Sequence, residues 1–390
     1  MNRFCFSDGR FRCRLIRPVV FSMAIVWGAL GWSSSGWAQS ARDQLQQAIS
    51  DWREVTKQAV EMGLRFRSSG REESIGYREQ YEDAIRRGNE LVDQIVPLAM
   101  RVLNETEQLD PDLNDLLARI ENYLFVQGQY EQAYRLGKKI LAKDADHTLA
   151  QIMTGRAALL TNRFEEAGTW LEPHGDVIEK LPAAEADLYL NLDKLKKSWD
   201  RELEIRAREA EADDLPRVEL KTTKGTIVLE LFENEAPGSV GNFVSLVENG
   251  FYDGTIFHRV LRKFMAQGGG FSDPGEAKKV NYSIFDECFK PEIRHHFRGV
   301  ISVAKGDAAH TGNSQFFITT VPTPGLDGWH TVFGRVIEGM DVVDRLNETH
   351  IVDTDSGREV PVQGVVPDRI LSSRVLRKRE HEYVPNKTIE

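Results

Sequence analysis

The 390-residue sequence is poor in cysteine and in long apolar runs, and it has no excess of basic residues. Three cysteines are too few for a disulfide framework. Acidic residues outnumber basic ones by 60 to 50, and the formal net charge of −10 argues against non-specific binding to nucleic acid or anionic lipid. The length predicts two or three domains. The ordinary composition excludes a collagen, a wholly disordered chain and a polytopic membrane protein.

The first 38 residues differ in charge from the remainder. They hold five arginines and one acidic residue, a net of +4, and two of the three cysteines. The apolar run of about 14 residues from Pro18 to Gly31 is too short to span a bilayer core of about 30 Å, but it suits a secretory signal. We therefore predict a signal peptide over 1–38, cleaved after Ala38, with an uncleaved membrane anchor as the alternative.

Cleavage would change both the charge and the thiol content of the mature protein. It would leave a net charge of −14, since −10 less +4 is −14, and Cys288 as the only cysteine. We expect Cys288 to be a buried or half-buried thiol rather than a redox sensor. The predicted location is the periplasm or cell envelope, with membrane attachment only if the signal is retained.

Helix-breaking residues are distributed unevenly along the rest of the chain. Residues 39–215 hold 9 glycines and 4 prolines, whereas residues 216–390 hold 18 and 9. Few breakers favour helices in the first half, and dense breakers between short β-branched runs favour strands and turns in the second. We predict a multidomain chain: a helical domain over 39–192, a solvated charged helical linker over 193–215, a β-rich domain over 216–380 and a tail over 381–390.

One internal repeat occurs in the helical half. The segment Gly128-Gln-Tyr-Glu-Gln-Ala133 recurs after 34 residues as Asn162-Arg-Phe-Glu-Glu-Ala167. This period, with an aromatic residue three positions before alanine, resembles the tetratricopeptide repeat. Only two repeats match, and the usual Trp, Tyr and closing Pro are missing. The helical half is therefore either a docking surface for a protein partner or a helical spacer.

The second half alternates in the manner of an antiparallel sheet. Val218–Leu220 and Thr226–Phe232 flank a turn and predict a hairpin. Apolar residues on one face predict a helix over 240–247, and a second short helix fits 340–346. Further short strands are expected over 255–258, 264–267, 298–304, 314–319, 331–336 and 369–377. Closing such a sheet into a barrel, with one helix at each end, would remove its exposed edges.

Three ordered sequence blocks resemble the signature of the cyclophilins. They are Phe257–Val260 with Phe264–Gly269, then Ser314–Ile318, then Leu326–Gly334. The resemblance extends from Val218 to near Arg379. It implies a closed antiparallel barrel of eight strands with two capping helices, following the all-α tetratricopeptide-like region. It also implies peptidyl-prolyl cis–trans isomerase activity with no metal and no cofactor.

The chemistry of prolyl isomerisation explains the residue types in these blocks. The barrier of about 18–20 kcal/mol arises because amide resonance is lost as the bond twists. No covalent bond has to form, so a donor that stabilises the twisted amide is enough. Arg259 suits this role because its guanidinium stays charged and presents a rigid fork of donors. The resemblance assigns the catalytic role to Arg259.

The resemblance also assigns the substrate-binding residues. It implies an apolar pocket for the proline ring, polar groups that bond the peptide and steady the arginine, and a histidine at the pocket rim. The pocket residues are Phe264, Met265, Phe317 and Leu326, the polar groups are Gln267 and Gln315, the histidine is His330, and Ala304 lines the groove.

Several positions depart from the family pattern. Gly325 replaces an aromatic residue, usually Trp, which widens the rim and weakens the expectation of tight cyclosporin binding. Lys305 stands where many members have an Asn that binds substrate backbone, and its side chain could instead favour an acidic residue nearby. The loop from Phe271 to His296 holds Cys288 and a His pair, but its irregular spacing argues against a metal site.

The sequence thus predicts an isomerase that acts on proline-containing polypeptides and assists the folding of exported proteins. One rival is a catalytically weak cyclophilin-like module that only binds peptides. The other is an envelope scaffold in which the helical repeats do the main work. The client proteins, the residue preferred before proline and the oligomeric state are not readable from the sequence.

Overall fold

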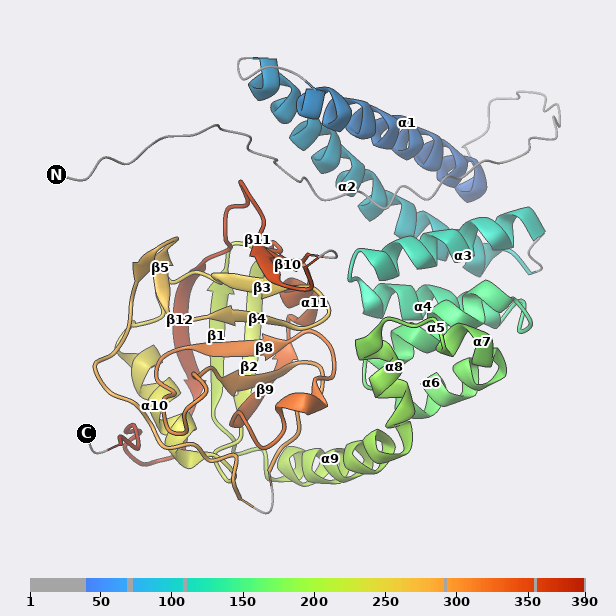
Figure 1. The fold of residues 1–390 in the computed structure, drawn as a ribbon. Coiled ribbons are helices and arrows are strands. Elements are labelled where there is room, and N and C mark those ends of the chain that lie inside the picture. Colours follow the sequence, from blue (N-terminus) through green and yellow to red (C-terminus); the bar gives the residue numbers. More distant parts are fainter. Residues whose placement is uncertain (1–39, 69–72, 108–110, 291–292, 354–355, 389–390) are drawn as a thin grey trace, which may run out of the picture. The chain divides into compact units, whose positions relative to one another are not determined.

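The computed structural model describes residues 40–68, 73–107, 111–290, 293–353 and 356–388 (Figure 1). The predicted signal over 1–38 lies outside the described residues. The chain divides into two compact units, residues 1–113 and 114–390. Within the described ranges, every helix is too short or too polar to cross a membrane.

The first unit is built on two long helices that lie side by side (Figure 1). They are α1 (Ala41–Ser68) and α2 (Glu73–Glu105). Apolar residues such as Leu45 and Ile95 are buried, as an amphipathic pair requires. Ser40 begins α1 with reciprocal hydrogen bonds, because its Oγ accepts from Asp43 N at 3.1 Å and its N donates to Asp43 Oδ2 at 3.3 Å.

Shorter helices follow up to the β-rich region. They are α3 (Pro111–Val126), α4 (Tyr130–Leu141), α5 (Thr148–Leu160), α6 (Phe164–Leu171), the 3₁₀ turn η1 (Glu172–His174), α7 (Gly175–Ile178), α8 (Ala183–Leu190) and α9 (Leu192–Ala212). Gly128 and Asn162 both have positive φ, +80° and +64°, in the turns before α4 and α6. Tyr130 and Phe164 are buried at the start of these helices. The two sequence repeats therefore have matching local structure, and the tetratricopeptide assignment itself stays a prediction.

Eight strands form one curled antiparallel sheet in the order β12-β1-β2-β9-β7-β8-β4-β3 (Figure 1). The strands are β1 (Arg217–Thr222), β2 (Gly225–Leu231), β3 (Arg259–Leu261), β4 (Met265–Gly268), β7 (Val300–Val303), β8 (Phe316–Thr319), β9 (Val332–Glu338) and β12 (Ile370–Arg377). Residues 255–258, predicted as a strand, form only an isolated bridge between Ile256 and Arg369. Because β12 and β3 are the ends of this order, a fully closed barrel stays a prediction.

The remaining elements cover or extend this sheet. They are α10 (Pro237–Glu248), α11 (Met340–Asp344), the 3₁₀ turn η2 (Pro324–Leu326), the pair β5 (Phe271–Asp273) and β6 (Glu276–Ala277), and the hairpin β10 (His350–Val352) and β11 (Glu359–Pro361). The apolar face of α10 is buried in the core of the sheet, where Phe243 meets Phe316 and Phe333 with ring centroids 5.6 and 5.3 Å apart. The predicted helices 240–247 and 340–346 are thus found within two or three residues at each end.

Helix α9 is not the solvated linker expected from its charge. Glu202 and Glu209 are buried, and both pair with the buried guanidinium of Arg294 in the β-rich region. Arg294 also lies over the ring of Phe232, with its Cζ 3.5 Å from the centroid. Charged residues were read as solvent-facing, but a carboxylate can be buried when an arginine bonds it. One face of α9 is therefore fixed to the β-rich region.

Candidate active site

The side chains singled out by the sequence come from neighbouring strands and adjacent loops. Arg259 lies on β3, Gln267 on β4 and Phe317 on β8. The register pairs Gln267 with Arg259 on one side and with Phe317 on the other. Antiparallel pairing of three short strands thus gathers residues that are up to 58 positions apart, since 317 less 259 is 58.

The predicted pocket residues form an apolar cluster separate from the main core. Met265, Ala304 and Phe317 are buried together with Leu261, and the partly buried Phe264 and Leu326 pack against them. Leu261 was not predicted, although it follows Arg259 by two positions on the same strand and so lies on the same face. The cluster offers an apolar surface of the kind that a proline ring requires.

Two glutamines connect Arg259 to the neighbouring strands. Arg259 Nη1 donates to Gln267 Oε1 at 3.3 Å, and Gln267 Nε2 donates to Gln315 Oε1 at 2.9 Å. The guanidinium also lies 5.7 Å from the centroid of the Phe264 ring, and Nη1 is 3.8 Å from the sulfur of Met265. The arginine therefore lies directly beside the apolar cluster.

Glu359 is a partner of Arg259 that the sequence did not reveal. Arg259 Nε and Nη2 donate to Glu359 Oε1 and Oε2, each at 2.6 Å. The hydrogen bonds and the charge of Arg259 lower the pKa of Glu359, so the carboxylate stays ionised near neutral pH. Glu359 lies on β11, 100 residues from Arg259 and outside all three sequence blocks, so no local signal pointed to it.

His330 stands at the side of Phe317 with a defined tautomer. Its Nδ1 lies 3.0 Å from the carbonyl oxygen of Val303, to which only an N–H can donate, so Nε2 is left as an acceptor in the neutral ring. Burial lowers the pKa of His330, which favours this neutral form. The ring meets Phe317 edge-on, with centroids 5.3 Å apart.

His296 and Asp327 pack next to Phe317 of the apolar cluster, and the sequence did not identify them as site residues. The ring of His296 stacks on Phe317 at 5.9 Å, and its Nδ1 bonds Asp327 Oδ1 at 2.9 Å. His295 bonds the other oxygen of Asp327 at 2.7 Å. Burial alone would raise the pKa of Asp327, but the hydrogen bonds from the two histidines outweigh it and lower the pKa to about 2.

The structure shows what surrounds Lys305 and Gly325, two positions that depart from the family pattern. Lys305 Nζ lies 3.7 Å from Asp286 Oδ2, and both side chains are almost fully buried. The ammonium group is therefore directed to an acidic residue of the chain itself. A Cβ built on Gly325 would meet no atom within 4 Å, so the space beside this residue is open.

The cysteine and histidine loop does not hold a cation-binding cluster in the described residues. No group of three or more His, Cys, Asp or Glu side chains in that part of the chain is placed to hold a metal ion. Cys288 is a buried free thiol whose pKa is raised by burial. The histidines at 295 and 296 bond Asp327 instead.

An arginine held beside an apolar pocket on a curled antiparallel sheet defines the cyclophilin class. Residues 217–373 match the family model described as cyclophilin type peptidyl-prolyl cis-trans isomerase. A peptidyl-prolyl cis-trans isomerase-like 1 of Neurospora crassa is 43% identical over 169 residues, which cover 42% of this chain and 97% of that protein. A protein of the same name from Mus musculus is 40% identical over 154 residues, which cover 38% of this chain and 88% of that protein. The chain therefore belongs to the cyclophilin-type peptidyl-prolyl isomerase family, and its carboxy-terminal region is an isomerase domain of this type.

Solved structures of the family are also similar to this region. A cyclophilin-type isomerase of Cryptosporidium parvum, solved in the presence of the dipeptide Ala-Pro, is 28% identical. It covers 41% of this chain and 98% of its own, with a TM-score of 0.33.

Proposed function

We propose that this protein isomerises X–Pro bonds in proline-containing polypeptides, with Arg259 as the catalytic donor, and that it assists the folding of exported proteins. The observation that carries the proposal is the position of the Arg259 guanidinium, which is held by Gln267 and Glu359 beside the apolar cluster. The predicted signal over 1–38 supports the exported location, and sequencing the amino terminus of the exported protein tests it.

Arg259 keeps donor capacity for a substrate. Glu359 accepts from Nε and Nη2, and Gln267 accepts from Nη1. An arginine has five N–H bonds, so two remain. One N–H of Nη1 faces only the weakly accepting sulfur of Met265 at 3.8 Å, a contact that a substrate oxygen or nitrogen can replace. Donation there would stabilise the twisted amide, because its nitrogen recovers a localised lone pair as resonance is lost.

The other site residues would position the peptide. The apolar cluster would hold the proline ring and keep water from the twisting bond. Gln315 fixes the amide of Gln267, so that the Gln267 oxygen faces Arg259. His330 would accept a hydrogen bond at Nε2, because its Nδ1 is committed to Val303. Each of these groups acts without forming a covalent bond.

The test compares proline-peptide isomerisation by the full chain and by Arg259→Ala and Arg259→Lys. We expect both variants to lose on the order of 10²-fold in kcat/KM, because one fixed donor is removed and a lysine ammonium cannot reproduce the planar fork. Arg262→Ala is the matched control, since the Arg262 side chain bonds Gln127 and Glu348 rather than the pocket. Undiminished turnover in folded Arg259→Ala would contradict the proposal.

The second candidate is a peptide-binding module with little catalysis. The two short hydrogen bonds to Glu359 favour it, because they compete with a substrate for the same guanidinium. Measuring peptide affinity beside turnover separates the two. Peptide binding without turnover that depends on Arg259 would support the binding module and contradict the proposal that Arg259 is catalytic.

A further inference from the structure

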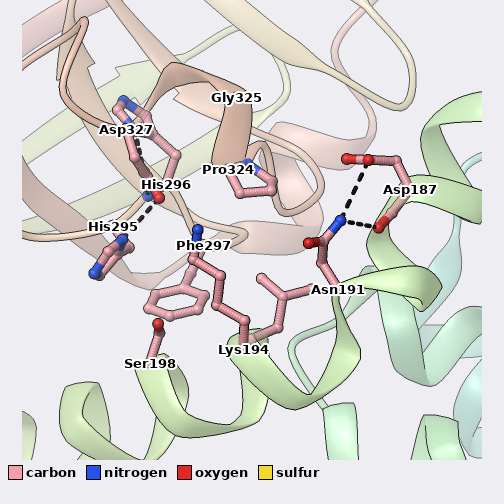
Figure 2. A pocket seen from close by; sticks show the side chains of 11 residues that line it. Asp187, Asn191, Lys194, Ser198, His295, His296, Phe297, Pro324, Gly325 and Asp327 are labelled. Carbon is pink, nitrogen blue, oxygen red and sulfur yellow. Dashed lines mark hydrogen bonds and ion pairs between the residues drawn. The ribbon is translucent and has the colours of Figure 1, made fainter.

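A cavity of about 190 Å³ lies beside the proline pocket, between the helices and the isomerase domain (Figure 2). Residues of α8 and α9, among them Lys194, form one wall. Residues 295–297 and the turn around Pro324 form the other. Leu326 of this turn packs in the apolar pocket, whereas its neighbours Gly325 and Asp327 line the cavity. A polypeptide whose proline occupies the pocket would thus pass the cavity within a few residues.

Gly325 lines the cavity without contributing a side chain. Its missing side chain would project into free space, because no atom lies within 4 Å of a Cβ built there. Gly325 thus leaves open space at the edge of the cavity, next to Leu326 of the apolar cluster.

The walls of the cavity are fixed relative to one another. Trp199 of α9 packs on Phe297 with ring centroids 4.7 Å apart, and Phe164 lies 6.1 Å from both rings. The buried ion pairs of Arg294 with Glu202 and Glu209 hold the same helix. Helix α9 is therefore a built part of the cavity and not a loosely placed neighbour.

The cavity lining holds the carboxylates of Asp187 and Asp327 and one lysine, Lys194, and only the carboxylates have partners among the described residues. Asp327 is satisfied by the hydrogen bonds from His295 and His296. Asp187 faces Asn191, whose Nδ2 donates to Asp187 Oδ1 at 3.3 Å (Figure 2). Lys194 extends from α9 toward the Pro324 turn (Figure 2). It makes no ion pair or hydrogen bond with the described residues, so its ammonium group is available to a ligand.

We propose that this cavity binds an acidic side chain of the polypeptide whose proline occupies the apolar pocket, with Lys194 as the cationic partner. The proposal rests on the proposed function, since it extends the same substrate site onto the helical part of the chain. If the proposal is correct, the helices help to determine which X–Pro sites the enzyme prefers as substrates.

The test uses the full chain and peptides in which Glu, Gln or Lys is moved from two positions before proline to three after it. Turnover and calorimetric affinity are both measured. At one position we expect the Glu peptide to exceed the Gln peptide by roughly two- to fivefold, as for a partly exposed ion pair, and the gain to weaken with salt. Lys194→Glu should reverse the preference toward the Lys peptide.

Two further variants sharpen the result. Lys197→Glu makes the same charge change on an exposed turn of α9 that does not line the cavity, and it should keep the preference for Glu. Gly325→Trp adds a large side chain at a residue that lines the cavity, and it should weaken the preference. Equal values for Glu and Gln peptides at every position, with turnover still dependent on Arg259, would overturn the cavity proposal and leave the proposed function intact. Turnover that does not depend on Arg259 would overturn the proposed function instead.

Discussion

Glu359 is the residue whose removal reveals most about how Arg259 is held. Its two hydrogen bonds fix the guanidinium with Nη1 toward the pocket. We expect Glu359→Ala to lower kcat by about fivefold with little change in KM, because immobilising a long side chain costs about 1 kcal/mol that the variant must supply in the transition state. Glu359→Gln, which can still accept a hydrogen bond, should recover part of the loss. Peptide-isomerisation kinetics provide the measurement.

The sign of the effect separates two roles of Glu359. A rise in kcat on substitution would show that the carboxylate competes with substrate for Arg259, as in the weak binding module. The pH dependence gives a second check. The pKa of Glu359 is lowered from 4.5 by Arg259, so the pair persists at neutral pH and is lost only as the pH falls through the lowered value. Wild-type activity should therefore approach that of Glu359→Ala only below about pH 4.5.

Site residues that the sequence identified lie together in short motifs, whereas the residue it missed lies far from Arg259 along the chain. Arg259, Gln267, Phe317 and His330 lie within compact blocks, so a motif identifies them together. Glu359 acts from a hairpin 100 residues away. Its selection depends on how the loop after α11 folds back over β3, which no local pattern encodes. Partners of this kind become visible only in three dimensions.

Helix α9 depends on a buried ion cluster that its sequence conceals. Arg294 pairs with Glu202 and Glu209, and all three side chains are at most 6% exposed. Arg294→Met should lower the free energy of unfolding by about 3–5 kcal/mol, since it leaves buried carboxylates without their main partner. Urea denaturation measures the change.

An exposed pair supplies the control for this substitution. Arg374 pairs with Glu219 at the surface, with 64% of the arginine side chain exposed. Arg374→Met should therefore lower the free energy of unfolding far less than Arg294→Met does. Equal losses in the two variants would show that the Arg294 cluster contributes no more than a surface pair.

Most predicted elements are found, including the strands expected over 264–267, 298–304, 314–319, 331–336 and 369–377, whereas the strand expected over 255–258 is not. The hairpin β1–β2 and the helices α10 and α11 follow from local patterns of apolar residues and turns. Residues 255–258 have the composition of a strand but meet only one bridge partner, at Arg369. Strand pairing depends on the neighbour as much as on the strand itself. The sequence did not predict which face of α9 is buried, because Glu202 and Glu209 on that face are charged.

The helices from α3 onward and the isomerase domain form one compact unit, residues 114–390. We therefore expect a fragment of residues 111–390 to unfold at nearly the same temperature as the full chain. A fragment of residues 216–390 loses α9, so Arg294 keeps only its longer ion pair with Glu235 and Phe297 loses Trp199. Its melting temperature should be about 10 °C lower, as a loss of several kcal/mol implies for a domain of this size.

The same fragments separate catalysis from substrate choice. Arg259, the apolar cluster and Glu359 all lie within 216–390, so this fragment should retain Arg259-dependent turnover at a temperature where it is folded. It lacks the wall that holds Lys194, so its preference for Glu over Gln peptides should vanish, whereas 111–390 should keep it. If 216–390 retained the preference, the acidic side chain would have to bind within the isomerase domain alone, and the helices would serve stability and not selection.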